Sequence, residues 1–190
     1  MIDTLIEIQR LKRLDRTGWT LRGLPSGTES VAAHSFGVAV SSMLIADELL
    51  ARGISVNVEK MLRIALLHDW AEARVGDMPR TAREYFDSES RKAAERAAFQ
   101  DIVIENGEAW RYRELYEDYE ERSSLEARLV KVADVIDLLV EALALERAGA
   151  RGLDEFWEVA KQPDFNFDAQ VHFVIGELFE SLLRARSELP

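Results

Sequence analysis

Apolar residues recur at intervals of three and four positions along most of the chain, which is the spacing of an amphipathic α-helix. In the stretch 2–14, for example, Leu5, Ile8 and Leu11 fall on one helical face. Alternation of apolar and polar residues, which would indicate β-strands, is scarce. Only 4 prolines and 10 glycines interrupt the 190 residues. The pattern therefore predicts an all-α fold, and the length fits a single domain over residues 1–190.

Local start and stop signals divide this pattern into about seven helices. Ser30 and either Ser123 or Ser124 are candidate N-caps, and Gly53 and Gly76 follow the ends of two helices. The expected helices cover 2–14, 30–52, 58–73, 88–106, 123–148, 153–161 and 168–186, with a short one at 79–85. The acidic region from 83 to 122 is most simply the solvated faces of two surface helices. We expect the C-terminal helices, 153–188, to pack on the rest of the domain.

Composition narrows the classes of partner. A net charge of −11 argues against non-specific nucleic-acid binding, which needs a basic face. No apolar run approaches the roughly 20 residues that span a bilayer, so we expect no membrane partner and a cytoplasmic location. The absence of cysteine leaves only nitrogen and oxygen to hold a metal. The segment from Arg10 to Arg22 nevertheless carries five bases and one acid, and is either an anion site or a helix end with a loop.

The candidate chemistry centres on residues 66–77, where ionisable side chains follow an apolar run. His68, Asp69 and Glu72 lie near the end of the helix expected at 58–73. His68 and Glu72 are four residues apart and would share one helical face. Burial of such groups is costly unless each is paired, hydrogen-bonded or bound to a metal. The two interpretations are a capped, partly exposed helix end and a metal site with a catalytic carboxylate beside it.

A polar stripe lies on the helix expected at 123–148. Between residues 130 and 145 its only polar side chains are Lys131, Asp134, Asp137 and Glu141. At about 100° per residue these four fall in an arc roughly 120° wide. The stripe either faces solvent or directs its upper part into a site. His34, in the first turn of another helix, is a further candidate ligand.

Five short motifs occur along the chain in a recognisable order. They are RTGW at 16–19, ESVAAH at 29–34, HDWAE at 68–72, GDMP at 76–79 and KVAD at 131–134. The order of the histidines and aspartates resembles the H…HD…D signature of the HD-domain metal-dependent phosphohydrolases. The motifs are most similar to the 5′-deoxynucleotidase branch, which includes the bacterial YfbR-type enzymes and the HD-domain-containing protein 2 group. The resemblance covers residues 11–148 and implies an HD-domain helical bundle.

The resemblance implies a metal centre with four protein ligands. These are His34, His68, Asp69 and Asp134. Imidazole nitrogens and carboxylate oxygens suit a first-row divalent ion with open positions for water and phosphate, and manganese, cobalt, iron, magnesium and zinc all stay open. Such an ion would lower the pKa of a bound water and polarise a phosphoryl oxygen.

Two carboxylates beside the ligands are the expected catalytic residues. We assign Glu72 to proton handling at the attacking water. Asp77 either protonates the departing nucleoside oxygen or positions the nucleophile, and the sequence does not separate these two roles. The structural alternative for Asp77 is a helix cap before Pro79.

Three further residues are expected to bind substrate. Arg16 matches the family position that holds the 5′-phosphate, through a charge-assisted contact. Trp19 matches a position that lines the sugar pocket, where an indole would exclude a ribose 2′-hydroxyl; ordinary core packing is the alternative. Lys131 either reaches the phosphate or is simply exposed.

The sequence therefore predicts an enzyme that hydrolyses deoxyribonucleoside 5′-monophosphates with a divalent metal, and the family suggests a homodimer. One alternative is the same metal site acting on another phosphomonoester or a modified nucleotide. Another is a non-catalytic regulatory module that binds metal. Only Ala33 favours the second alternative, because the family usually has an acidic residue immediately before the first ligand histidine.

Overall fold

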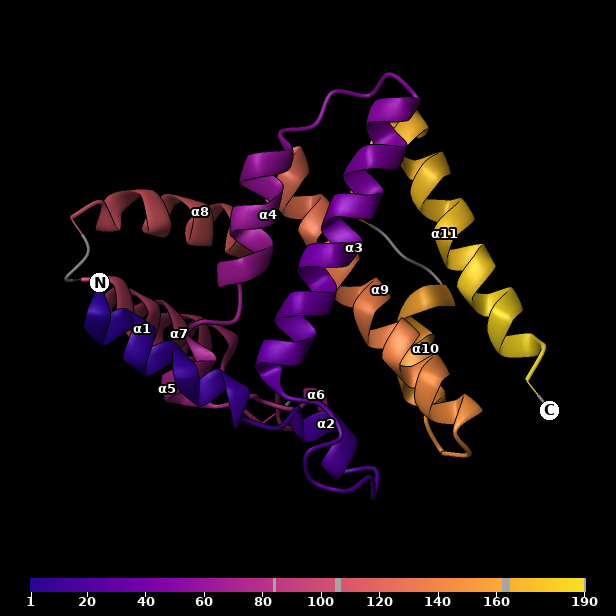
Figure 1. Cartoon of the computed structure of the whole chain (residues 1–190), viewed down its shortest axis with the longest axis horizontal. Coiled ribbons are helices and arrows are strands. Elements are labelled where there is room, and N and C mark those ends of the chain that lie inside the picture. The colour runs from indigo at the N-terminus through magenta and orange to yellow at the C-terminus, as the bar shows by residue number, and fades with distance from the viewer. Residues whose placement is uncertain (84, 105–106, 162–164, 190) are drawn as a thin grey trace. The chain divides into compact units, whose positions relative to one another are not determined.

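The computed structural model describes residues 1–83, 85–104, 107–161 and 165–189 (Figure 1). Within these ranges every regular element is a helix, and the one extended pairing is an isolated bridge between Asp15 and Ser30. The predicted all-α fold is therefore confirmed. None of the described helices is long and apolar enough to cross a membrane.

The elements follow one another along the chain as shown in Figure 1. They are α1 (Ile2–Ile8), the 3-10 helix η1 (Gln9–Lys12), α2 (Thr17–Thr20), α3 (Val31–Ala51), α4 (Val58–Leu67), α5 (Glu72–Val75), α6 (Arg80–Arg83), α7 (Ser88–Val103), α8 (Ala109–Glu121), α9 (Leu125–Arg147), α10 (Asp154–Lys161) and α11 (Ala169–Ser187). The long helices α3, α7, α9 and α11 correspond to predicted stretches, and α8 is the second surface helix expected in the acidic region from 83 to 122. Residues 105 and 106 of the helix expected at 88–106, and residue 84 of the short helix expected at 79–85, lie outside the described residues.

One prediction about the central stretch is wrong. The helix expected at 58–73 ends at Leu67, and a tight turn separates it from α5. Backbone hydrogen bonds of the i to i+3 kind run through this turn, including Trp70 N–H to the Leu67 carbonyl at 3.1 Å and Glu72 N–H to the Asp69 carbonyl at 3.1 Å. His68 and Glu72 therefore do not share the face of one continuous helix.

Tertiary packing explains why the helix ends there. The Trp70 ring stacks with Phe99 at 6.2 Å and with Tyr112 at 6.0 Å between ring centroids. Ala71, the next residue, is only 3% exposed. The chain must turn to bury both residues against α7 and α8, and this packing outweighs the local preference for helix.

The chain divides into two compact units. The first unit contains residues Met1–Phe36 and Leu66–Glu117. Its apolar core comprises Leu11, Val31, Leu67, Ala71, Ala73, Ala98, Phe99, Ile102, Val103 and Tyr116. Phe99 is fully buried, and its ring stacks on Tyr116 with centroids 4.1 Å apart. This core fixes the start of α3, the 68–71 turn and α5 around one another.

The second unit contains Gly37–Ala65 and Asp118–Pro190. Helix α9 is its longest element, and α10 and α11 both pack against it. Ser124 caps α9 by accepting a hydrogen bond from Ala127 N–H at 3.1 Å, as predicted. Helix α3 passes very close to α9 at Gly37, where a β-carbon would overlap the Asp137 carboxylate. The prediction of one domain over the whole chain stays a prediction.

Candidate functional site

A short extended pairing fixes the N-terminal loop beside the start of α3. Arg16 N–H donates to the Glu29 carbonyl at 3.0 Å, and Val31 N–H donates to the Leu14 carbonyl at 2.9 Å. Between these bonds lies the isolated bridge from Asp15 to Ser30. The backbone of Arg16 is thus tied to the segment that leads into α3.

His34 lies in the first turn of α3 and is almost fully buried. The turn is anchored by Ser30, whose hydroxyl accepts a hydrogen bond from Ala33 N–H at 3.1 Å, as the predicted N-cap requires. Val31, also in this turn, is part of the apolar core. The imidazole of His34 is 1% exposed, so its direction is set by packing rather than by solvent.

Three cationic or nitrogen-bearing side chains converge on one oxygen of Asp69. Its Oδ2 lies 3.2 Å from His68 Nε2, 3.7 Å from His34 Nε2 and 3.4 Å from Arg16 Nη1. The two imidazole rings are 5.6 Å apart between centroids and inclined by 62°. His68 is fully buried, whereas the side chain of Asp69 keeps 16% exposure. The first unit therefore brings together three of the four predicted ligands and the predicted phosphate-binding arginine.

The electrostatics of Asp69 favour its ionised form. Burial by itself would raise the pKa of this carboxyl group. The hydrogen bond and electrostatic influence of His68, together with those of His34 and Arg16, outweigh burial and hold the pKa of Asp69 below its ordinary value. Two imidazole nitrogens and an ionised carboxylate form a donor set that suits a divalent first-row metal. The residues present therefore fit the predicted metal.

Asp77 is held by Thr17, a residue that the sequence interpretation missed. Asp77 Oδ2 accepts hydrogen bonds from Thr17 N–H at 2.6 Å and from the Thr17 hydroxyl at 2.7 Å. Its other oxygen, Oδ1, lies 4.0 Å from Arg16 Nη1. Thr17 is the first residue of α2, so Asp77 caps this helix from 60 residues away. Asp77 thus caps α2, whereas the structural alternative from the sequence placed its cap at a helix beginning near Pro79.

Trp19 and Glu29 form a second pair within this loop. Trp19 is 1% exposed, and its indole N–H donates to Glu29 Oε2 at 2.6 Å. The burial agrees with the core-packing alternative for Trp19, and the hydrogen bond adds an anchor for the ring. The only sequence signal for Glu29 and Thr17 is their place in the ESVAAH and RTGW motifs.

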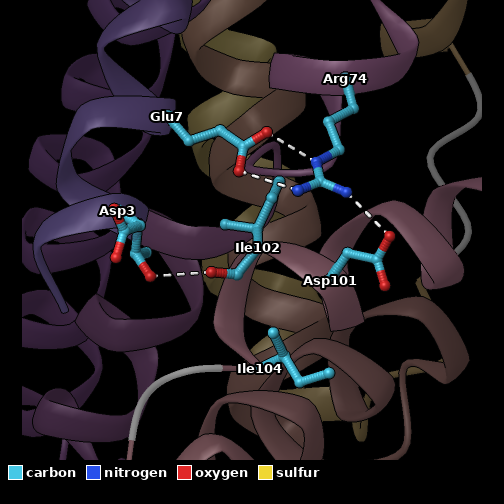
Figure 2. Close-up of a pocket in the computed structure, with 7 residues that line it drawn as sticks. Asp3, Glu7, Arg74, Asp101, Ile102 and Ile104 are labelled. Carbon is cyan, nitrogen blue, oxygen red and sulfur yellow. Dashed lines mark hydrogen bonds and ion pairs between the residues drawn. The ribbon is translucent and has the colours of Figure 1, made fainter.

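Glu72 begins α5, and ion pairs fix this short helix in place. Arg74 donates to Glu7 on α1 at 2.6 Å and to Asp101 on α7 at 2.8 Å (Figure 2). These contacts border a pocket of about 270 Å³. Its lining residues are Asp3, Thr4, Glu7, Arg74, Asp101, Ile102 and Ile104. No predicted site residue lines this pocket. We therefore interpret it as a space beside the ion pairs that hold α5, the helix on which Glu72 lies.

Asp134 and Lys131 lie on α9 in the second unit. Asp134 Oδ2 accepts a hydrogen bond from Lys131 Nζ at 2.6 Å and another from the Tyr119 hydroxyl at 3.1 Å. Lys131 is therefore bonded to the predicted fourth ligand. Tyr119, on α8, is a second residue that the sequence interpretation missed.

The family model described as HD domain matches residues 8–164. The chain belongs to the HD-domain family. The matched part of the chain includes every predicted site residue, and the predicted resemblance is confirmed.

HD-domain relatives with a named activity are similar over most of this chain. The 5′-deoxynucleotidase HDDC2 of Danio rerio is 31% identical over 142 residues, which is 75% of this chain and 68% of that protein. The 5′-deoxynucleotidase hdd1 of Schizosaccharomyces pombe is 32% identical over 157 residues, 78% of this chain and 75% of that protein. Among solved structures, the PH0347 protein of Pyrococcus horikoshii OT3 is 37% identical with a TM-score of 0.84, covering 97% of this chain and 99% of that chain.

Proposed function

We propose that this HD-domain protein is a metal-dependent 5′-deoxynucleotidase, which hydrolyses deoxyribonucleoside 5′-monophosphates to a deoxynucleoside and phosphate. The observation that carries the proposal is the convergence of His34, His68 and Arg16 on the Asp69 carboxylate. This convergence places side chains that can bind a divalent metal beside a guanidinium group that can bind phosphate. The named 5′-deoxynucleotidase relatives support the same reaction class.

The metal would be held by His34, His68 and Asp69, with Asp134 as the fourth ligand. The support for Asp134 is its position in the KVAD motif, inside the part of the chain matched by the HD domain family. When bound, a divalent ion would polarise a phosphoryl oxygen and acidify water, and its identity stays open among manganese, cobalt, iron, magnesium and zinc. Lys131 and Tyr119 orient the Asp134 carboxylate through their hydrogen bonds.

The remaining residues bind the phosphate and move protons. Arg16 lies beside Asp69 and Asp77 and has the planar donor geometry that pairs with two phosphate oxygens. Glu72 takes the proton of the attacking water, from a short helix that Arg74 holds rigidly. Asp77 is the second carboxylate of the proposed site and lies next to Arg16, where it either protonates the leaving oxygen or positions the nucleophile.

Specificity for deoxyribose would come from Trp19. A rigid indole wall offers no partner to a 2′-hydroxyl, and a hydroxyl that loses water without gaining a partner is disfavoured. The bond from Trp19 to Glu29 supplies the rigidity. The alternative of a different phosphomonoester on the same metal site has no comparable support in this structure.

The predicted homodimer and cytoplasmic location are further proposals. Four apolar side chains on α3 are well exposed, namely Phe36 at 70%, Met43 at 42%, Leu44 at 59% and Leu50 at 44%. An exposed apolar stripe of this kind is typical of a surface that binds another protein. We therefore propose that α3 contributes to a dimer interface.

The test is phosphate release by metal-stripped protein after each divalent ion is restored in turn. The substrates are 5′-deoxynucleotides, 5′-ribonucleotides and 3′-deoxynucleotides, and Glu72→Ala is measured in parallel. We expect metal-dependent release confined to 5′-deoxynucleotides and abolished by Glu72→Ala. Equal release from all three classes would refute the specificity, and tight metal binding without release would favour the regulatory module.

A further inference from the structure

Thr17 makes more contacts with Asp77 than a cap of a four-residue helix requires. Its backbone N–H donates to Asp77 Oδ2 at 2.6 Å. Its hydroxyl lies 2.7 Å from the same oxygen and 3.0 Å from the Asp77 carbonyl oxygen. Both donors of Thr17 are thus directed at one aspartate that is 60 residues away. The Asp77 side chain is only 9% exposed, so water contributes little to holding it.

These contacts fix the backbone on both sides of Arg16. On one side, Arg16 N–H is bonded to the Glu29 carbonyl at 3.0 Å. On the other, the peptide group that joins Arg16 to Thr17 is bonded to Asp77. A planar peptide group held at its N–H leaves the preceding residue little freedom. The Arg16 main chain is therefore immobilised before any ligand arrives.

The side chain of Arg16 is held in the same way. Its Nη1 lies 3.4 Å from Asp69 Oδ2 and 4.0 Å from Asp77 Oδ1, so the guanidinium bridges the two carboxylates. The Thr17 hydroxyl sets the orientation of one of these carboxylates. An arginine that is ordered in advance loses less side-chain entropy when it binds an anion.

We propose that Thr17 is a positioning residue for phosphate: it orients Asp77, which together with Asp69 holds the Arg16 guanidinium ready for the substrate phosphate. The proposal rests on the proposed function, in which Arg16 contacts that phosphate. Thr17 acts on binding, since it affects the group that receives the phosphate. Loss of its hydroxyl therefore weakens the affinity for phosphate and raises KM. Because Asp77 is also a proposed catalytic carboxylate, kcat falls as well, and the affinity for inorganic phosphate is the readout of positioning.

The experiment compares three substitutions in the metal-loaded protein. Thr17→Val removes the hydroxyl and keeps the shape, and Thr17→Ser keeps the hydroxyl. Thr20→Val makes the same change on α2, where the hydroxyl donates to the Thr17 carbonyl at 3.1 Å and not to Asp77. We expect Thr17→Val to raise Ki for inorganic phosphate, and KM for a 5′-deoxynucleotide, by about tenfold, and to lower kcat because Asp77 is also a proposed catalytic residue. Thr17→Ser and Thr20→Val should stay within about twofold of the parent protein in all three constants.

A double-mutant cycle separates positioning from a general loss of structure. In the Arg16→Ala background, Thr17→Val should have no further effect on phosphate binding, because its target is already absent. A loss of similar size in both backgrounds would overturn the proposal. So would an unchanged KM and phosphate Ki in the single Thr17→Val variant.

A binding measurement keeps this proposal distinct from the proposed function. Calorimetric titration of inorganic phosphate into the manganese-loaded protein needs no turnover. If the parent protein binds phosphate, Thr17→Val weakens that binding and no deoxynucleotide is hydrolysed, the positioning role is supported and the proposed function fails. Equal phosphate affinity in the parent and Thr17→Val proteins overturns the positioning role, whether or not deoxynucleotides are hydrolysed.

Discussion

The bond between Trp19 and Glu29 should contribute measurably to stability. Glu29→Leu removes the carboxylate and replaces it with an apolar side chain of similar size. The indole N–H then loses an acceptor at 2.6 Å while its ring stays 1% exposed. A buried donor that loses its acceptor costs about 1–3 kcal/mol, and bonds to charged acceptors lie toward the upper part of that range. We therefore expect a loss of about 2 kcal/mol, which is close to a 30-fold change in the folding equilibrium.

The assay is urea unfolding at 25 °C, followed by far-ultraviolet circular dichroism. With a slope of about 2 kcal/mol per molar urea, the loss corresponds to a midpoint lower by about 1 M. Glu29→Gln keeps an oxygen acceptor without the charge and should lose about half as much. Glu59→Leu is the matched control, because Glu59 is 76% exposed and its pair with Arg63 is a surface pair. It should change the free energy of unfolding by less than about 0.5 kcal/mol.

The same variants test the role of the indole in specificity. If Glu29 fixes Trp19, Glu29→Leu should lower the ratio of kcat/KM for deoxy- over ribonucleotides by about tenfold, whereas Glu29→Gln should largely preserve it. A Glu29→Leu midpoint equal to that of the parent protein would refute the hydrogen-bond argument. A Glu29→Gln variant as unstable as Glu29→Leu would do the same, because the amide oxygen can still accept.

Three further predictions concern residues of the first unit. Phe99→Ala, at a fully buried ring stacked on Tyr116, should lower the free energy of unfolding by about 3–5 kcal/mol in the same urea assay. A hydrogen bond from Arg74 lowers the pKa of Glu7, so its stabilising contribution is present above the ordinary value of 4.5 and is lost as pH falls below it. The stability difference between the parent protein and Glu7→Gln should therefore shrink from pH 7 toward pH 3. Removal of metal should lower the melting temperature, manganese should restore it, and His68→Ala should abolish that response.

Features set by neighbouring residues could be predicted from the sequence. Caps at Ser30 and at either Ser123 or Ser124 are predicted, and Ser30 and Ser124 make them, because a cap depends on a side chain and the backbone three residues ahead. The end of α3 before Gly53 was also predictable, since this glycine adopts a φ of 78° that other residues rarely tolerate. The all-α class follows from the same short-range periodicity.

Features that depend on residues far apart in the sequence could not be predicted. From its neighbours in the sequence, Asp77 could be interpreted as a helix cap before Pro79. Its carboxylate is instead bonded to Thr17, which precedes it by 60 residues. Glu29 had no individual signal, although its carboxylate holds the Trp19 indole. The motifs mark these residues as belonging to one family pattern, but the hydrogen bonds between motifs depend on how the loop 14–31 folds against α5 and the turn before it.

The end of α4 shows how a wrongly predicted helix end changes the expected geometry of the proposed site. Adjacent residues on a continuous helix point about 100° apart, so His68 and Asp69 would diverge if the predicted helix continued to residue 73. Because the chain turns after Leu67, His68 Nε2 comes within 3.2 Å of Asp69 Oδ2. The turn is itself fixed by the stacking of Trp70 on Phe99 and Tyr112. The third residue of the HDWAE motif therefore places the first two as a pair of proposed ligands, and the aromatic core beneath it is a structural requirement of the proposed site.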